Sequence, residues 1–238
     1  MELPALGELL PPLPELPRGR VLLVLDGDSV RLADRRTIRL ACIDAPDLGL
    51  SGPDRRAPEE HRKNFHVEPG TAEDDEPRPP RAVEQTHAAQ AHDALRHRAL
   101  RQAVTLLAPS SRKDPQGRLV CDVELDDGTS LSAYLVSRGL AYVVRDPDYP
   151  QEYADALLAL QNRAMAERLG FWGTILDLEA ARQPWIGSSE TGLFYSSRDV
   201  RGQQIKPRLR VYFGTLLDAF AAGFAPASSR DFWPGVVR

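Results

Sequence analysis

The sequence has few of the features, such as many cysteines or long apolar runs, that are typical of secreted or membrane-spanning proteins. Two cysteines among 238 residues are too few for a disulfide framework, and their spacing fits neither a Cys-x-x-Cys motif nor a zinc site. Cys42 and Cys121 lie in apolar strand-like runs, so we expect buried thiols, with a disulfide between neighbouring strands as the alternative. No apolar stretch approaches the ~18 residues of a membrane span. Prolines interrupt the short apolar runs at the N-terminus, unlike the apolar core of a signal peptide. We therefore expect a cytoplasmic rather than a secreted protein, and no membrane partner.

An excess of positive charge is also missing. The formal net charge is −4 and the pI is about 5.8. Dedicated nucleic-acid binders are usually basic, because their affinity comes largely from neutralising phosphates. Any phosphate binding by this chain must therefore come from a local site. The apolar content of 42% and the charged content of 27% are ordinary for a soluble globular protein, and the length indicates one domain or one domain with additions.

Carboxylates gather where the predicted strands end. An Asp-Gly turn separates the first two apolar runs, and Asp28 follows it. The third run ends in Asp44 and Asp47, which flank Ala-Pro, and Arg39 lies within that run. Taken singly, Asp-Gly is most often only a turn and Asp-Ala-Pro only the end of a strand. Together, three acidic oxygen donors beside a cation indicate a hard metal and an anionic ligand.

The order and spacing of these residues resemble those of the thermonuclease family, also called staphylococcal nuclease-like. The resemblance is carried by Asp-Gly-Asp-Ser at 26–29, Ile-Arg-Leu-Ala-Cys-Ile-Asp-Ala-Pro-Asp at 38–47 and Gly-Arg at 117–118, with further similarity at 135–141 and 166–172. It covers roughly residues 19–173. It implies an α+β fold, a five-stranded OB-type β-barrel with about three helices, whose mouth is formed by strand ends and loops.

The resemblance also implies a metal site. Asp28 and Asp44 would bind Ca²⁺ through their carboxylates, and the Ala45 carbonyl would be a third ligand. Asp26 would support these ligands without binding the metal itself. Carboxylate and carbonyl oxygens are the donors that Ca²⁺ prefers.

The catalytic residues implied by the resemblance are Arg39, Arg118 and Asp47. The two arginines would hold the phosphate, because a planar guanidinium suits two-point contact with an oxyanion. Asp47 would orient or deprotonate the attacking water. The implied activity is calcium-dependent hydrolysis of phosphodiester bonds in DNA or RNA. An endonuclease is one form of this activity, and the sequence leaves endonuclease and exonuclease action open.

Two departures from the family pattern bear on activity. Asp47 stands where the family has Glu, and misplacing a catalytic group by ~1 Å can cost ~10²-fold in rate. Gln116 stands where the family often has an aromatic residue that stacks on a base, and Arg145 and Pro147 do not match a pair of tyrosines known in one member. Tyr142 or Tyr149 are alternative stacking residues, and helix packing explains them equally well. These departures keep open a second function, a weakly active or non-catalytic module that binds nucleic acid or a partner.

Prolines divide the rest of the chain. Residues 1–18 alternate Leu, Pro and Glu, and we expect an extended arm. Residues 48–82 mix six prolines with charges of both signs and few large apolar residues. Such a segment buries too little surface to offset its ordering entropy, so we expect a mobile insertion in the nuclease-like domain of residues 19–173.

Periodicity gives the remaining elements. We expect a helix over 83–102, strands over 103–108 and 119–125, and a short helix over 130–140. Asp148 and Gln151 have the spacing of a capping box for a helix that ends at Gly170.

Residues 174–238 form a C-terminal extension of unknown role. Its aromatic residues argue against disorder, and its sequence indicates a strand over 209–213 and a short helix over 216–224. It carries no motif. It is a candidate interface for a partner or a second copy, and the oligomeric state stays open.

Overall fold

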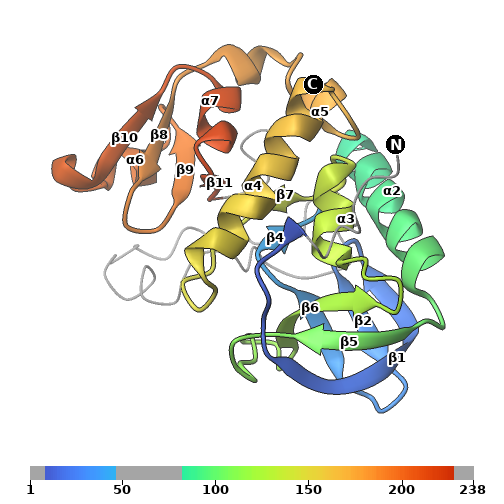
Figure 1. Cartoon of the computed structure of the whole chain (residues 1–238). Helices are drawn as coiled ribbons and strands as arrows, with labels where there is room; N and C mark the ends of the chain where they lie inside the picture. The colour runs from blue at the N-terminus through green and yellow to red at the C-terminus, as the bar shows by residue number, and fades with distance from the viewer. Residues whose placement is uncertain (1–8, 47–81, 228–238) are drawn as a thin grey trace, which may run out of the picture.

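Five strands close into a barrel in the computed structural model, which describes residues 9–46 and 82–227 (Figure 1). Their order is β1-β2-β3-β6-β5, and only β3 and β6 run parallel. The strands are β1 (Glu15–Asp26), β2 (Ser29–Leu32), β3 (Thr37–Leu40), β5 (Ala103–Leu107) and β6 (Leu119–Leu125). The prediction of mixed helices and strands is confirmed, and β6 has the predicted bounds.

The first strand begins earlier than the sequence suggested. Four residues of the predicted arm, 15–18, belong to β1, which pairs with β5 from Glu15 onward. Pro17 is tolerated because the pairing is irregular between Leu16 and Gly19. A proline donates no backbone hydrogen bond, so it fits a bulge better than a regular ladder. Residues 1–8 lie outside the described residues.

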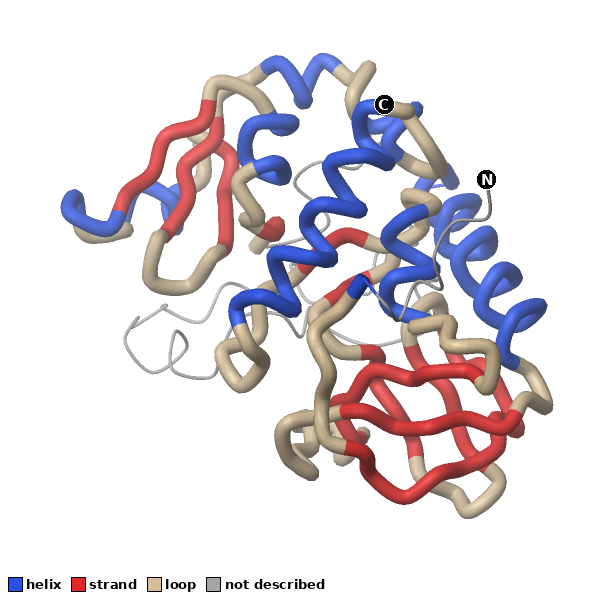
Figure 2. Tube along the Cα trace, in the orientation of Figure 1, coloured by secondary structure: helices blue, strands red, loops and turns tan. Residues whose placement is uncertain are grey.

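Three helices pack beside the barrel (Figures 1 and 2). They are α2 (Ala82–Ala99), α3 (Leu131–Ser137) and α4 (Gln151–Ala166). The buried positions of α2 include Ala88, Ala91 and Leu95, which recur at helical spacing. The start of α3 is fixed by Ser130, whose side chain accepts a hydrogen bond from the backbone N–H of Ala133.

The capping box predicted for α4 is wrong. The N-cap is Pro150, with no side-chain cap. Asp148 forms an ion pair with Arg112 instead, so a tertiary contact prevails over the local pattern. The helix also ends at Ala166, four residues before the predicted stop at Gly170.

The C-terminal extension folds into a second sheet in the order β10-β8-β9-β11. Its strands are β8 (Trp185–Ser188), β9 (Leu193–Ser196), β10 (Arg210–Phe213) and β11 (Ala225–Pro226). The connecting helices are α5 (Trp172–Ile175), η2 (Glu179–Arg182), α6 (Val200–Gln204), η3 (Pro207–Leu209) and α7 (Leu216–Ala221). Sequence analysis located β10 and α7 but missed the other three strands.

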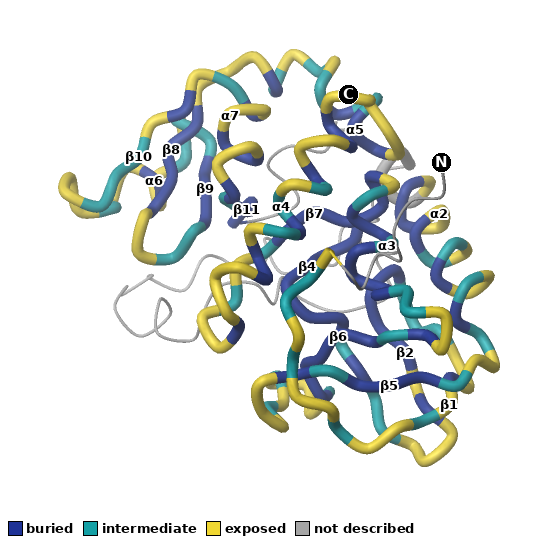
Figure 3. The backbone as a smooth tube through the Cα atoms, in the orientation of Figure 1, coloured by how far each residue is buried: buried dark blue, intermediate teal, exposed yellow. Residues whose placement is uncertain are grey.

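Two hydrophobic cores stabilise these layers, and buried segments run through both in Figure 3. The first core fills the barrel and extends to the faces of α2 and α3 that pack against it. The second joins the new sheet to α4 and α5, and it contains residues on both sides of position 173, among them Phe171, Trp172 and Phe220. The extension therefore shares its core with the end of the nuclease-like segment.

The short pair β4 (Ile43–Asp44) and β7 (Tyr142–Val143) lies between the barrel and the second core. Both cysteines are buried and unbonded, and burial raises the pKa of each thiol. The expected buried thiols are thus confirmed. Among the described helices, none is both long and apolar enough to span a bilayer.

Candidate active site

The predicted site residues come from strand ends that the barrel brings together. Asp26 ends β1 and pairs with Ser29, which in turn pairs with Arg39 across β2 and β3. The turn that joins β1 to β2 is tight, and the Asp28 backbone N–H donates to Asp26 Oδ1 at 3.1 Å. A side chain at Gly27 would meet the Cβ of Ala45 at 2.7 Å. A glycine here is what allows the turn to lie against the segment that carries the next carboxylate.

Arg39 links the two predicted metal ligands. Its Nη1 lies 2.7 Å from Asp28 Oδ2, and its Nη2 lies 2.8 Å from Asp44 Oδ1. All three side chains are largely buried, with exposed fractions of 17% for Arg39, 9% for Asp28 and 10% for Asp44. One guanidinium thus faces two carboxylates, and the group carries an excess of negative charge that a bound cation would offset.

Asp28 is held in place from several directions. Its Oδ2 accepts the backbone N–H of Ala45 at 2.9 Å, and its Oδ1 accepts the hydroxyl of Ser29 at 3.1 Å. Burial raises the pKa of this carboxyl to about 6; the Arg39 charge opposes the rise, and Asp26 adds to it. Such a displaced pKa in a cluster of charged groups is typical of functional sites.

Asp44 is fixed by Tyr142, which sequence analysis considered only as a residue that could stack on a base. Asp44 and Tyr142 are direct neighbours across β4 and β7, and the Tyr142 hydroxyl donates to Asp44 Oδ2. The Tyr142 ring packs on Phe220 of the C-terminal extension, with ring centroids 5.6 Å apart. No local pattern indicates this contact, because the two residues are 98 positions apart in the sequence.

Tyr142 and Tyr149 are both buried, so the suggestion that either stacks on a base is wrong. The Tyr149 hydroxyl donates to the Val120 carbonyl oxygen at 3.2 Å, which ties the loop before α4 to β6. Packing explains both residues.

Arg118 approaches the same site from the start of β6. Its Nη1 donates to the Ser29 hydroxyl at 2.9 Å and lies 3.9 Å from Asp26 Oδ2. Its Nε donates to Asp114 Oδ2 at 2.6 Å. Asp114 also accepts the Arg118 backbone N–H, so this carboxylate holds the loop and orients the arginine. Sequence analysis missed Asp114; its position four residues before Arg118 is the only signal.

A chain of contacts therefore connects the two arginines. Arg118 donates to Ser29, Ser29 donates to Asp28, and Asp28 pairs with Arg39. Five of the predicted site residues, Asp26, Asp28, Arg39, Asp44 and Arg118, and the backbone of Ala45 lie in this network. Asp47, the predicted base, lies outside the described residues, as does the predicted insertion up to residue 81.

Asp28 and Asp44 provide the type of oxygen donor that a hard cation prefers, but fewer donors than such a cation needs. Asp28 and Asp44 offer carboxylate oxygens on either side of one guanidinium. Within residues 9–46 and 82–227, no group of three or more His, Cys, Asp or Glu side chains could hold a metal. A Ca²⁺ ion, which takes six to eight oxygens, would need the Ala45 carbonyl and water as well.

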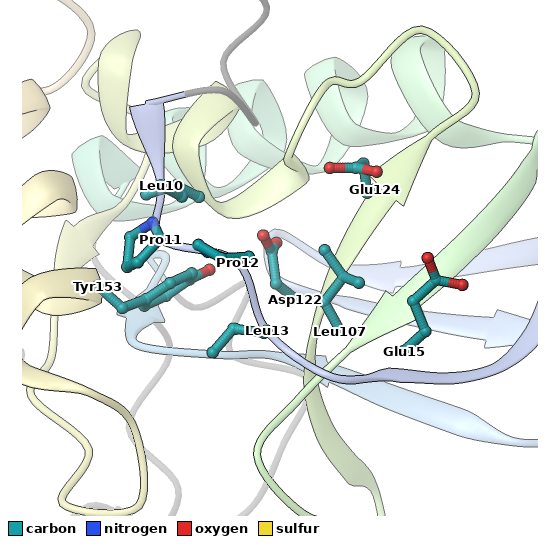
Figure 4. A pocket seen from close by; sticks show the side chains of 9 residues that line it. All are labelled: Leu10, Pro11, Pro12, Leu13, Glu15, Leu107, Asp122, Glu124 and Tyr153. Atoms are coloured by element: carbon teal, nitrogen blue, oxygen red, sulfur yellow. The ribbon is translucent and has the colours of Figure 1, made fainter.

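A cavity away from this site is lined by other residues. It has a volume of about 250 Å³. Figure 4 shows the side chains that line it, which include Asp122 and Tyr153 but none of the predicted site residues. Burial raises the pKa of Asp122, whose Oδ1 accepts the backbone N–H groups of Val123 and Ser132 at 2.8 Å and 3.3 Å. This carboxyl therefore joins β6 to the first turn of α3.

Comparison with known proteins gives one family match. The family model described as staphylococcal nuclease homologue matches residues 37–174, which is more than half of the chain. The matched region includes Arg39, Asp44 and Arg118 and ends near the start of the second sheet. Comparison with curated proteins finds no significant match.

Proposed function

The chain belongs to the family of staphylococcal nuclease homologues, and we propose that it is a calcium-dependent nuclease that hydrolyses phosphodiester bonds of DNA or RNA. The family implies an OB-type fold, and the closed five-stranded barrel with a helix between β3 and β5 agrees with it.

The observation that carries the proposal is the position of Arg39 between Asp28 and Asp44, at 2.7 Å and 2.8 Å. A phosphodiester repels nucleophiles through its own negative charge, so its hydrolysis needs positive charge in a site with little water. Burial of this group supplies the low-dielectric setting. Arg39 lies within the group, and Arg118, directly before β6, is joined to it through the Ser29 hydroxyl.

Asp28 and Asp44 would hold the calcium ion with the Ala45 carbonyl, supported by Asp26. When bound, calcium would supply Lewis-acid polarisation of a phosphate oxygen. Tyr142 keeps Asp44 oriented through its hydroxyl, and the Ala45 N–H does the same for Asp28.

The remaining chemistry falls to the arginines and Asp47. Arg39 and Arg118 would contact the non-bridging oxygens of the phosphate, whose charge grows as a water oxygen attacks phosphorus. Asp47 would accept the proton from that water. The bond from phosphorus to the leaving oxygen then breaks, and Arg118 would support the charge that develops there.

The test is hydrolysis of a fluorescently labelled single-stranded oligonucleotide with calcium, with EDTA, and with the variant Asp28→Asn. We expect cleavage by the wild type in calcium alone, and a loss of at least ~10²-fold in Asp28→Asn. Circular dichroism checks that the variant is folded. Wild type that binds the oligonucleotide without cleaving it would favour the non-catalytic module instead.

The assignment of Asp47 has its own test. If the shorter carboxylate misplaces the water, Asp47→Glu raises kcat by about 10-fold, equal to about 1.4 kcal/mol of barrier, and leaves KM nearly unchanged. An unchanged or lower kcat in Asp47→Glu would mean that the site is already adapted to Asp47.

A further inference from the structure

A strongly basic segment lies in the C-terminal extension, beyond the family match. Residues 198–210, here called the basic segment, carry five basic side chains and one acidic side chain, a net charge of +4 in a chain of net charge −4. The basic side chains are Arg198, Arg201, Lys206, Arg208 and Arg210. The segment runs through α6 and η3 into β10, at the end of the sheet far from the barrel (Figure 1).

The basic segment occupies one face of the second sheet. Tyr212, Ile186 and Tyr195 are direct neighbours across β10, β8 and β9, so their side chains share that face. Helix α6 packs there, because a side chain at Gly202 would meet the Cβ of Tyr195 at 2.9 Å. The opposite face carries Phe213 and packs into the second core.

Two of the five cations hold the segment in shape. Arg210 donates from Nε to the Ile205 carbonyl oxygen at 2.7 Å and from Nη2 to the Gln203 carbonyl oxygen. Arg201 pairs with Asp199 at 2.7 Å, and its guanidinium lies 5.5 Å from the centre of the Tyr195 ring.

The other three cations face water. Arg198, Lys206 and Arg208 are exposed, and none of the three forms an ion pair with any residue that the structure describes. Figure 3 shows the link between α6 and β10 as an exposed stretch. These side chains thus present positive charge that the fold itself does not use.

An exposed aromatic ring lies on the same face. Tyr212 is 70% exposed, on the edge strand β10, whose neighbouring residue Phe213 is buried. Alternation along the strand turns the Tyr212 ring toward the face that carries the basic segment. Exposed cations and an open aromatic ring are the two elements by which proteins bind single-stranded nucleic acid, because the cations neutralise phosphates and the ring stacks on bases.

We propose that this face binds single-stranded nucleic acid, with Arg198, Lys206 and Arg208 on phosphates and Tyr212 stacked on a base. A duplex hides the faces of its bases, so the exposed ring favours a single strand. Binding here does not depend on catalysis. Its role in retaining a long substrate near the barrel rests on the proposed nuclease function.

The test uses the full chain in EDTA, where no hydrolysis is expected, and fluorescence anisotropy of a labelled single-stranded oligonucleotide. Lys206→Gln with Arg208→Gln removes two charges from the surface. Arg96→Gln with Arg182→Gln removes two exposed charges from α2 and η2 and is the matched control. We expect the first pair to weaken binding about 10-fold and to lower the salt slope by about 1.4, from ~0.7 for each lost phosphate contact. An equal effect in both pairs would overturn the proposal.

Tyr212 separates stacking from charge. Tyr212→Ala is expected to weaken binding about 10-fold, within the range for one stacked base, while Tyr212→Phe keeps the affinity. Loss of binding in both variants, or in neither, would contradict a stacking role.

Two further arms distinguish this proposal from others. Cleavage of a dinucleotide, too short to reach both sites, should proceed in calcium at the wild-type rate in Lys206→Gln/Arg208→Gln. If the wild type cleaves the dinucleotide and this variant binds the oligonucleotide normally, the proposed binding surface is wrong and the proposed nuclease function is supported. If the wild type cleaves nothing and the variant loses binding, the binding surface is supported and the nuclease function is wrong. If the same variant instead loses only sedimentation with phosphatidylserine vesicles, the face is a membrane-binding surface and the proposal fails.

Discussion

The barrel and the C-terminal sheet bury different kinds of side chain. The barrel core is mostly aliphatic, and three carboxylates, Asp28, Asp44 and Asp122, are buried in or beside it. The core of the C-terminal sheet is aromatic, and among the described residues 174–227 no carboxylate is buried. Buried charge is costly unless it is paired, so a region that retains it is where function is expected. The aromatic core supplies rigidity instead.

The two regions meet at Tyr142. Its ring belongs to the aromatic core, and its hydroxyl belongs to the carboxylate site through Asp44. Gln161 adds a second link, since it accepts the Val143 N–H at 2.7 Å and donates to the Phe220 carbonyl oxygen at 2.9 Å. The C-terminal extension is therefore expected to affect the site without touching substrate there.

The largest effect is expected when the charge balance of the barrel is broken. Arg39→Ala leaves Asp28 and Asp44 buried without their shared cation, and we expect a loss of about 3–5 kcal/mol in the free energy of unfolding, together with loss of hydrolysis. Arg39→Lys keeps the charge and should recover much of the stability but little of the activity, because one ammonium cannot replace the two-point contact. Urea unfolding and oligonucleotide cleavage measure both. Equal activity in Arg39→Lys and wild type would contradict the role of the guanidinium.

The next effect tests whether the aromatic core supports the site. Phe220→Ala and Phe213→Ala each remove a buried ring from that core and should each cost about 3–5 kcal/mol. Of these two residues, Phe220 packs on Tyr142, whereas Phe213 packs on Phe224. We expect cleavage activity, measured where both variants are folded, to fall further in Phe220→Ala. The same activity in both would show that the core does not reach the site.

A smaller effect isolates the hydroxyl of Tyr142. Tyr142→Phe keeps the packing and removes the hydrogen bond to a carboxylate, which should cost about 1.5–3 kcal/mol of stability and weaken calcium binding. Tyr153→Phe is the control, because the Tyr153 hydroxyl is buried beside Asp122 without a hydrogen-bond partner of good geometry. We expect its melting temperature to change little. A larger loss of stability in Tyr153→Phe than in Tyr142→Phe would contradict the role given to the Tyr142 hydroxyl.

The smallest effect concerns the buried carboxyl outside the site. Burial raises the pKa of Asp122 above its ordinary value of 3.8, so the folded protein keeps a proton that the unfolded chain loses. Stability should therefore fall as pH rises from about 4 through the folded pKa, by about 1.4 kcal/mol for each unit of displacement. Asp122→Asn can still accept the two backbone N–H groups and removes this decline. Unfolding at pH 4 and pH 7 should show a stabilising effect of the variant at pH 7 alone; an equal effect at both would contradict it.

Sequence reasoning found the part of the site that depends on short-range order. Asp28 lies in the turn between β1 and β2, Arg39 in β3 and Asp44 in β4. One short stretch of the chain therefore carries all three, and its turn signals and apolar runs indicate that they lie near strand ends. The contact of Tyr142 with Asp44 was missed, because the two residues meet only through tertiary packing. Asp114 was missed because it acts through the geometry of its loop.

The same limit explains the errors in the fold. The local pattern predicted a capping box at Asp148, whereas the Asp148 side chain forms an ion pair with Arg112 instead. Five prolines indicated an extended arm over residues 1–18, whereas residues 15–18 belong to β1, with Pro17 at a break in its ladder. Strands β8, β9 and β11 are short and held by aromatic contacts across the sheet, such as Trp185 with Phe194, which periodicity does not record. The role of Asp47 stays a prediction.

The central claim is that Asp28 and Asp44 hold a calcium ion beside Arg39, and calcium titration by calorimetry tests it most directly. The full chain, wild type and Asp28→Asn, is titrated at pH 8, above the pKa of about 6 for Asp28. We expect one calcium site in the wild type and none in Asp28→Asn, with both proteins folded. Equal calcium affinity in the two proteins, or no binding to the wild type with or without oligonucleotide, would contradict the claim.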